Sequence, residues 1–357
     1  MAKRVLIFPA GMPRSLAYLE KALAEGEDVI GSSSLGFDPA REKYPLWAFL
    51  PYVSSNEFDE ALRQVIDEFD IGGIFTPNPV VWDYLNRKLP ESFPGVRLVN
   101  GSPVENEMAS YHKALEFARA VLADQLPLAT CQDTVVAMSV LDVATLFRHA
   151  ETIPGMCDHE KIRALCDVMR YCPPGDVVEI GSWWGKSAFV LLRLAQLCRI
   201  GKLLFVDPWS NAHLIQNDEK GLLDHIAIDA DEALTVFQLN LLPYTNGDLN
   251  YLRLPSVDAA SVYGRQAKIA TPVFGETVFQ GQIALLHIDG NHSYADAKAD
   301  VEAWSERVLP GGWMVVDDYI WPYGDGPKRA GDEYLADHAA DVQCAFVMGS
   351  ALFVQKR

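Results

Sequence analysis

The sequence predicts an α/β protein made of two Rossmann-like domains. Short apolar runs alternate with amphipathic helical segments along both halves of the chain, which is typical of parallel sheets covered by helices on both faces. The length of 357 residues suits about two domains of ordinary size. The last two apolar runs flank Gly349 and Ser350, which favours an antiparallel hairpin at the end of the second sheet. That second sheet is therefore expected to be doubly wound and mixed.

The first half opens with an apolar run that ends at a turn from Pro9 to Gly11. Ser15 is a candidate cap for the next helix, in which apolar residues recur at helical spacing. Runs of the same two kinds continue to about residue 124, which closes the first predicted domain, 1–124. The expected strands are 4–8, 28–31, 46–53, 71–76 and 96–99, and the expected helices are 16–24, 57–69 and 112–123.

Residues 125–150 are less regular and are expected to form a connector with a helix near 140–149. The second predicted domain, 151–357, begins with a helix that Pro173, Pro174 and Gly175 bring to an end. Strands and helices then alternate as far as the closing hairpin. The expected helices are 160–171, 187–198 and 294–308, and the expected strands are 176–180, 202–206, 251–254, 283–288, 313–316, 344–348 and 351–355.

The charge balance bears on the class of partner. Lys and Arg total 30 and Asp and Glu total 48, which gives a formal net charge of −18. Such a surface repels phosphate backbones, so nucleic acid is not an expected partner. No apolar run reaches the roughly 18 residues needed to span a bilayer, and Pro9 and Gly11 interrupt the first run, so we expect a cytoplasmic protein without a membrane partner.

The cysteines do not favour a zinc site or a disulfide framework. They form no C-x-x-C pair, and none lies near a histidine at zinc-ligand spacing. Buried free thiols are the expected state in a chain of this length and compartment. The six are Cys131, Cys157, Cys166, Cys172, Cys198 and Cys344.

The most informative segment runs from Val177 to Ala188, where an apolar strand enters a glycine-containing loop and a helix follows at once. Gly181 and Gly185 allow a tight turn and the close approach of a ligand, and the free amides at the helix start favour an anionic group. The loop is one residue too short for a P-loop and lacks the middle glycine of a dinucleotide fingerprint. The pattern E-x-G-x-x-x-G instead matches class I S-adenosylmethionine-dependent methyltransferases. An ordinary strand-to-helix turn is the alternative.

S-adenosylmethionine carries a carboxylate and a ribose, and the chain offers a partner for each. The Ser187 hydroxyl lies at the helix start, and Asp207 ends the next strand, where an acid can accept both ribose hydroxyls. The expected donor-binding residues are Glu179, Gly181, Trp183, Gly185, Ser187 and Asp207, together with Asp289.

Two later strands also end in acidic residues. Asp289 follows the strand 283–288, and Asp317 and Asp318 follow the strand 313–316, so all three should lie at the carboxyl edge of the sheet. Carboxylates this close repel one another, so either some stay protonated or a divalent cation neutralises them. Hard oxygen ligands suit Mg²⁺ or a similar ion, which makes these three the candidate metal ligands. For Asp317 and Asp318, a capping pair or a solvated loop end is the alternative.

His292, three residues after Asp289, is the candidate general base, because imidazole titrates near neutrality. A metal beside the donor lowers the pKa of a substrate hydroxyl, whose oxygen then attacks the sulfonium methyl group. A surface histidine without a function is the alternative.

The segments 178–188, 287–300 and 309–318 carry a family resemblance over residues 150–357. They resemble metal-dependent O-methyltransferases of the catechol type, and more closely the bacterial branch with the macrolide-sugar and cephamycin-biosynthesis methyltransferases. The resemblance implies Mg²⁺ at Asp289, Asp317 and Asp318, His292 as base, and donor contacts from Ser187 and Asp207. It also places Ser256 in the segment that contacts adenine.

Two features limit what the resemblance implies. Asp318 stands where catechol-type enzymes usually have Asn, which disfavours the catechol branch, and the acceptor-binding elements are not recognisable. Residues 1–124 resemble the nucleotide-binding-like domain that precedes ATP-grasp domains. Its glycine loop lacks a dinucleotide fingerprint. A role in substrate recognition, dimerisation or scaffolding is expected there, with scaffolding or dimerisation favoured.

The sequence therefore predicts methyl transfer from S-adenosylmethionine to a hydroxyl of a small molecule, a sugar or a natural-product intermediate. Two alternatives stay open: a non-catalytic S-adenosylmethionine-binding or regulatory protein, and a metal-independent methyltransferase acting on nitrogen or carbon. A second copy of the chain, forming a homo-oligomer, stays open as a further partner.

Overall fold

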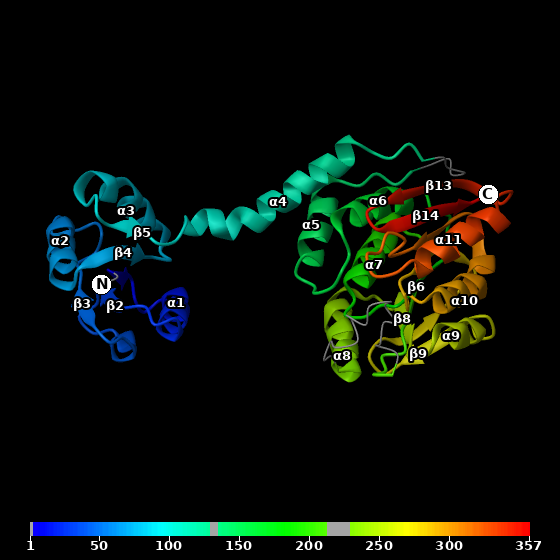
Figure 1. Cartoon of the computed structure of the whole chain (residues 1–357), viewed down its shortest axis with the longest axis horizontal. Coiled ribbons are helices and arrows are strands. Elements are labelled where there is room, and N and C mark those ends of the chain that lie inside the picture. Colours follow the sequence, from blue (N-terminus) through cyan, green and yellow to red (C-terminus); the bar gives the residue numbers. More distant parts are fainter. Residues whose placement is uncertain (1–2, 129–134, 213–228) are drawn as a thin grey trace. The chain divides into compact units, whose positions relative to one another are not determined.

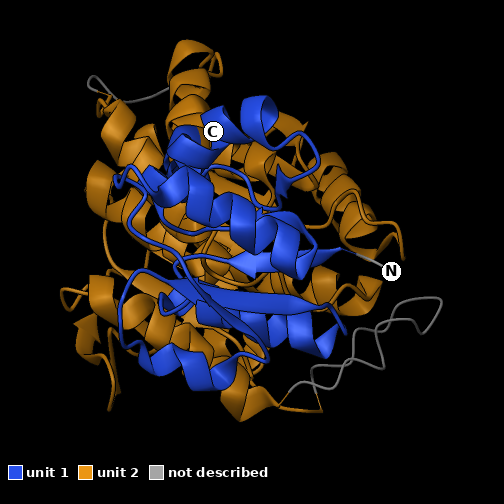
Figure 2. Ribbon diagram, turned by 90° about the vertical axis from the view of Figure 1, so that its left-hand side faces the viewer, with its two compact units in different colours: residues 1–112 blue, residues 113–357 orange. Residues whose placement is uncertain are grey.

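The structure is a computed structural model that describes residues 3–128, 135–212 and 229–357. The chain divides into two compact units, Met1–His112 and Lys113–Arg357 (Figure 2). Each unit has its own sheet and its own hydrophobic core. Within the described ranges, no helix is both long and apolar enough to cross a membrane. Cys131 lies outside these ranges. The other five cysteines are free thiols, four of them buried as predicted, whereas Cys344 is half-buried.

The first unit contains a five-stranded sheet in the order β3-β2-β1-β4-β5, in which every pair is parallel (Figure 1). Helices α2 and α3 pack on one face of the sheet, and α1 packs on the other. The elements are β1 (Arg4–Ile7), α1 (Pro13–Ala24), β2 (Val29–Ser33), η1 (Pro39–Lys43), β3 (Trp47–Phe49), α2 (Phe58–Phe69), β4 (Ile71–Phe75), α3 (Pro79–Ser92), β5 (Arg97–Leu98) and α4 (Pro103–Ala123), which continues into the second unit.

The second unit contains a seven-stranded sheet in the order β13-β14-β12-β11-β6-β7-β8. The last strand in sequence, β14, runs antiparallel to both of its neighbours, and the strands from β12 to β8 are parallel. This is the doubly wound mixed sheet with a closing antiparallel hairpin that the sequence predicts, so the predicted fold class is confirmed.

Helices cover both faces of this sheet. One core layer contains residues of α4 to α8, and the other contains residues of α9 to α11. The elements are α5 (Val140–Ala150), α6 (His159–Arg170), β6 (Asp176–Ile180), α7 (Lys186–Cys198), β7 (Leu203–Val206), α8 (Ala230–Leu241), η2 (Leu242–Tyr244), β8 (Leu249–Leu252), α9 (Ser256–Tyr263), β9 (Lys268–Thr271), β10 (Gly275–Val278), β11 (Ile283–Ile288), α10 (Tyr294–Trp304), η3 (Ser305–Arg307), β12 (Val308–Val316), α11 (Gly326–Asp337), β13 (Val342–Met348) and β14 (Ala351–Lys356).

Several predicted boundaries were wrong. The helix expected over 294–308 ends at Trp304, because β12 begins at Val308 rather than at Trp313. Helix α4 begins at Pro103, nine residues before the expected start, with a proline in its first turn, where the missing amide costs no hydrogen bond. Helix α3 was not predicted, although Asn78 caps it and Pro79 opens it. The expected connector contains α5, whose apolar side chains lie in the core of the second unit.

Candidate active site

Three strand ends meet at one edge of the second sheet. Ile288 of β11 pairs with Ile180 of β6 on one side and with Val316 of β12 on the other. The residues that follow continue this pairing, because the Asp289 amide donates to the Ile180 carbonyl and the Asp317 amide to the Ile288 carbonyl, both at 2.8 Å. The glycine loop after β6 and the acids after β11 and β12 are therefore neighbours, as the sequence predicts.

Gly181 allows the loop after β6 to cross the backbone of Asp289. Its φ is +80°, and a Cβ atom added there would lie 1.8 Å from the Asp289 carbonyl oxygen. No other residue fits at this position. Gly185, with a φ of +91°, opens helix α7 and places Ser187 in its buried first turn.

Asp207 fixes the backbone of the glycine loop after β6 through hydrogen bonds. Its Oδ2 accepts hydrogen bonds from the amides of Ser182 and Trp183, both at 3.0 Å, and its Oδ1 accepts one from the Trp209 amide at 2.7 Å. Burial raises the pKa of this carboxyl, and the three amide hydrogen bonds oppose that rise. Asp207 therefore shapes the loop directly.

Glu179 lies fully buried on β6 and turns toward the acid side of the site. Its Oε2 accepts a hydrogen bond from the Ser182 hydroxyl at 2.8 Å, and its Oε1 lies 3.0 Å from Nδ1 of His287. Glu179 thus connects the glycine loop to β11, which the sequence pattern alone did not indicate.

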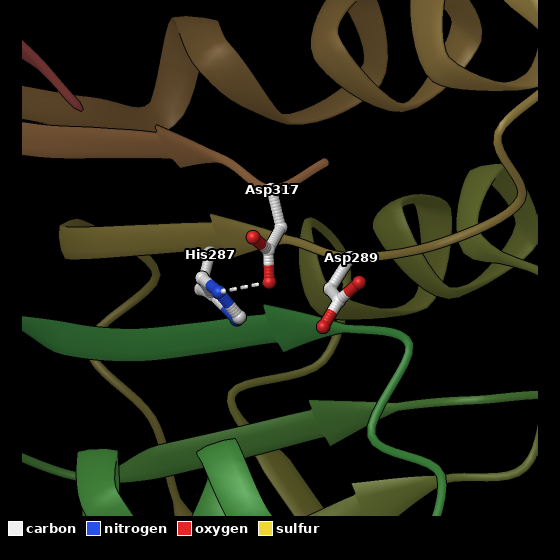
Figure 3. A group of neighbouring side chains, drawn as sticks. All are labelled: His287, Asp289 and Asp317. Carbon is white, nitrogen blue, oxygen red and sulfur yellow. Dashed lines mark ion pairs between the residues drawn. The ribbon is translucent and has the colours of Figure 1, made fainter. Parts of the chain in front are cut away.

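The acids after β11 and β12 form two overlapping groups with histidines. His287, Asp289 and Asp317 form one (Figure 3), and Asp289, His292 and Asp318 form the other. In each group, one ligand atom per residue lies within 4.8 Å of the others. His292 Nε2 lies 3.0 Å from an Asp318 oxygen and 4.0 Å from an Asp289 oxygen. The carboxylate-rich donor set fits a hard divalent cation such as Mg²⁺ or Mn²⁺.

The charges of this cluster show how crowded it is. Burial, followed by the charge of Asp289, raises the pKa of Asp318 to about 7. Burial and the charge of Asp317 raise the pKa of Asp289 as well. The raised pKa values of Asp289 and Asp318 agree with the expectation that acids lying this close together resist ionisation.

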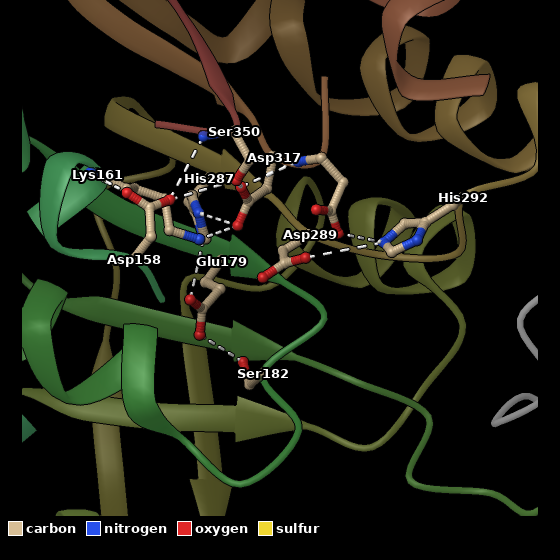
Figure 4. A network of polar contacts seen from close by, with 10 residues as sticks. Asp158, Lys161, Glu179, Ser182, His287, Asp289, His292, Asp317 and Ser350 are labelled. Carbon is tan, nitrogen blue, oxygen red and sulfur yellow. Dashed lines mark hydrogen bonds and ion pairs between the residues drawn. The ribbon is translucent and has the colours of Figure 1, made fainter. Parts of the chain in front are cut away.

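Asp317 is the exception, because it is already paired (Figure 4). Its Oδ2 forms a buried ion pair with Lys161 of α6 and lies 3.6 Å from His287 Nε2. Its Oδ1 accepts hydrogen bonds from the Asp318 amide at 3.0 Å and the Ser350 hydroxyl at 3.2 Å. Burial alone would raise the pKa of Asp317, but the Lys161 charge holds it well below its usual range.

His287 is the second partner of Asp317. Burial opposes its protonation, but the carboxylates of Asp317, 3.6 Å from Nε2, and Glu179, 3.0 Å from Nδ1, raise its pKa to about 9. Sequence reasoning missed His287, Lys161 and Ser350 as parts of the site. His287 gave a signal, because it is the one polar residue in the apolar strand Ile283–Ile288.

Not every predicted residue reaches this cluster. Ser256 opens α9, and its hydroxyl accepts a hydrogen bond from the Trp304 indole at 3.0 Å. Trp183 is half-buried within the glycine loop, where its amide donates to Asp207. His292 does belong to the cluster, and its ring also packs edge-on against Trp321, with ring centroids 4.5 Å apart.

Among the comparisons with known proteins, a family model supports the general class. A family model described as a methyltransferase domain matches residues 178–319, which include both the glycine loop and the acid cluster. The coarser prediction, a methyltransferase domain in the second half, is confirmed. No curated protein matches the chain.

Solved structures give weaker similarities. The O-methyltransferase NovP is 16% identical with a TM-score of 0.37, over 70% of this chain and 98% of its own. CalS11, a TDP-rhamnose 3'-O-methyltransferase in calicheamicin biosynthesis, is 15% identical with a TM-score of 0.39, over 72% and 96%. MycE of the mycinamycin pathway, in complex with Mg and SAH, is 16% identical with a TM-score of 0.30, over 51% and 45%. These similarities are too low to transfer a substrate or a metal.

Proposed function

We propose that the second unit transfers a methyl group from S-adenosylmethionine to a hydroxyl group of a small molecule, with a divalent cation and His292 assisting. One observation carries the proposal: the glycine loop that Asp207 shapes and the acid cluster around Asp289 meet at one sheet edge, inside the segment matched by the methyltransferase-domain model. The proposed domain of this activity is 151–357. For residues 1–124 we propose scaffolding or dimerisation.

The donor half of the site belongs to the loop after β6. Gly181 and Gly185 keep its backbone free of side chains, and the start of α7 with the Ser187 hydroxyl offers donors to the carboxylate of the methyl donor. Asp207 offers its remaining lone pairs to ribose hydroxyls. We propose that Ser256 lies at the end of the donor site that holds the adenine.

The acceptor half belongs to the loops after β11 and β12. Asp289, Asp317 and Asp318 would hold the cation, which when bound lowers the pKa of an acceptor hydroxyl. His292 accepts the hydroxyl proton on its ring, and Asp318, 3.0 Å away, stabilises the imidazolium that results. The fixed crossing of the two loops at Gly181 orients donor and acceptor toward each other.

Calorimetry with S-adenosylhomocysteine tests the donor site, and methyl transfer to a panel of hydroxylated sugars tests the reaction. We expect Asp289→Asn and His292→Ala to lower turnover at least 100-fold, since each removes a group that acts on the acceptor. Binding of S-adenosylhomocysteine should change less than about tenfold in His292→Ala. Glu302→Gln, an exposed change on α10, serves as the control.

Two results would contradict the proposal: wild-type protein that does not bind S-adenosylhomocysteine, or His292→Ala protein with full turnover. Wild-type protein that binds S-adenosylhomocysteine but methylates no acceptor in an untargeted screen would instead support a binding or regulatory role.

A second candidate is methyl transfer without a metal. The specific observation in its favour is that Lys161 and His287 already supply positive charge to Asp317. Activity that survives dialysis against a chelator would select this candidate, and activity that is lost and then restored by Mg²⁺ would select the first.

A further inference from the structure

We propose that Lys161 is a built-in counter-ion of the cation site: its ammonium group fixes Asp317 and keeps divalent-cation binding weak and exchangeable. This inference rests on the proposed metal-assisted function and adds a positioning residue to it. Lys161 comes from α6, whereas the three acids and His292 come from the loops that follow β11 and β12.

The position of Lys161 is fixed from two sides (Figure 4). Asp158 caps α6 and accepts a hydrogen bond from the Lys161 amide at 2.8 Å, which holds the first turn of the helix in place. The same Asp158 lies 3.4 Å from the amide and the hydroxyl of Ser350 at the hairpin tip. Ser350 in turn donates to Asp317. The hairpin, the helix cap and the acid are thus tied together around the lysine.

The Lys161 side chain has no access to solvent, with 1% of its surface exposed, and its partner Asp317 is 3% exposed. A buried ammonium this close cannot be screened by water. Asp317 also accepts two hydrogen bonds on its other oxygen, so its charge is met by the protein before any cation binds. Asp289 and Asp318, with 21% and 24% of their side chains exposed, are the acids that keep access to solvent.

Any dication that Asp317 helps to bind must therefore tolerate the Lys161 charge. Removing that charge should strengthen cation binding by removing repulsion. It should also destabilise the metal-free protein, because Asp317 would remain buried without its main counter-ion. The two effects are linked, since the cation then replaces the lysine.

The test uses Mn²⁺ alone, whose binding is measured by electron paramagnetic resonance on the full-length protein, together with Tm values with and without Mn²⁺. We expect Lys161→Met to bind Mn²⁺ at least tenfold more tightly than wild type. Its Tm should fall without metal and recover with Mn²⁺. The double variant Lys161→Met with Asp317→Asn removes both charges, so its Tm should recover without metal while the tighter binding disappears. Lys298→Met removes an exposed lysine and should behave as wild type.

Each remaining outcome decides the matter. If wild type binds Mn²⁺ and Lys161→Met binds it no more tightly, the counter-ion role is overturned while the proposed function stands. If Lys161→Met folds only when Mn²⁺ is present, the inference is supported. If the double variant folds but Lys161→Met does not fold even with Mn²⁺, the inference is overturned. If neither wild type nor any variant binds Mn²⁺, metal assistance and this inference fall together, while S-adenosylhomocysteine binding reports on the donor site independently.

Discussion

Gly181 is the residue at which the two halves of the candidate site touch. Its backbone passes so close to the Asp289 carbonyl that a methyl group has no room, and its positive φ disfavours any side chain as well. Steric exclusion and backbone strain therefore act at one position, and the two can be separated by experiment.

Replacing Gly181 with Ala should lower the free energy of unfolding by about 3 kcal/mol or more, because both penalties apply. The matched control is Gly247→Ala, where φ is +72° but no atom lies within 4 Å of the added Cβ. That control should lose only about 1 kcal/mol, the conformational term alone. Urea denaturation at one pH measures both, and equal losses would show that the close approach to Asp289 is not what requires glycine.

The sequence predicted which residues lie at the carboxyl edge of the second sheet. Asp289, Asp317, Asp318 and His292 were expected there because parallel strands end at a common edge, and the structure places them in two overlapping groups that share Asp289. Lys161 was not found, because its contact with Asp317 depends on how α6 packs on the sheet, and a lysine in the first turn of an amphipathic helix reads as exposed.

At the scale of elements, α10 carries a buried acid toward the sheet. Asp300 is 6% exposed and lies beneath Gly290, where an added Cβ would come within 2.7 Å of its oxygen. Burial raises the pKa of Asp300 to about 7, with a hydrogen bond from Ser256 opposing the rise. Helix α10 therefore brings a carboxyl that is partly protonated near neutrality against the loop that follows β11.

The sign of the pH dependence follows from that shift. The native pKa lies above the unfolded value, so the stability that the protonated carboxyl contributes is present below about pH 4 and is lost as the pH rises through about 7. Asp300→Asn should then raise the free energy of unfolding by about 2 kcal/mol at pH 8 and change it little at pH 4. Urea denaturation at both pH values measures this, with Glu302→Gln on the same helix as control. A gain that is equal at pH 4 and pH 8 would contradict the burial of a charge as its cause.

Element boundaries were predicted less well than element order. The order of strands and helices follows from alternating hydrophobic patterns, which is why the doubly wound sheet was predicted correctly. The ends of α10 and β12 were not, because residues 305–307 form a 3₁₀ turn that continues the helical pattern without belonging to α10.

At the scale of the whole molecule, the two units have separate cores. The core of the first unit around Phe58 and the core of the second around Leu191 share no residues. Calorimetry should therefore show two unfolding transitions. Phe58→Ala should lower the Tm of one transition and Leu191→Ala the Tm of the other. Each variant should reduce the free energy of unfolding of its own unit by about 3 kcal/mol or more. S-adenosylhomocysteine should raise only the transition that Leu191→Ala lowers. A single transition that both variants shift equally would show that the units unfold together.

The buried pairs of the site join parts of the chain that are far apart in sequence. Lys161 and Asp317 are separated by 156 positions, and Glu179 and His287 by 108. Closing such distant contacts is entropically slow, so folds dominated by them form on long timescales. The second unit should accordingly fold slowly, and the Glu179–His287 pair should form as β6 and β11 align. During synthesis α6 is made before β12, so the charge of Lys161 has no acid partner until Asp317 has been added to the chain.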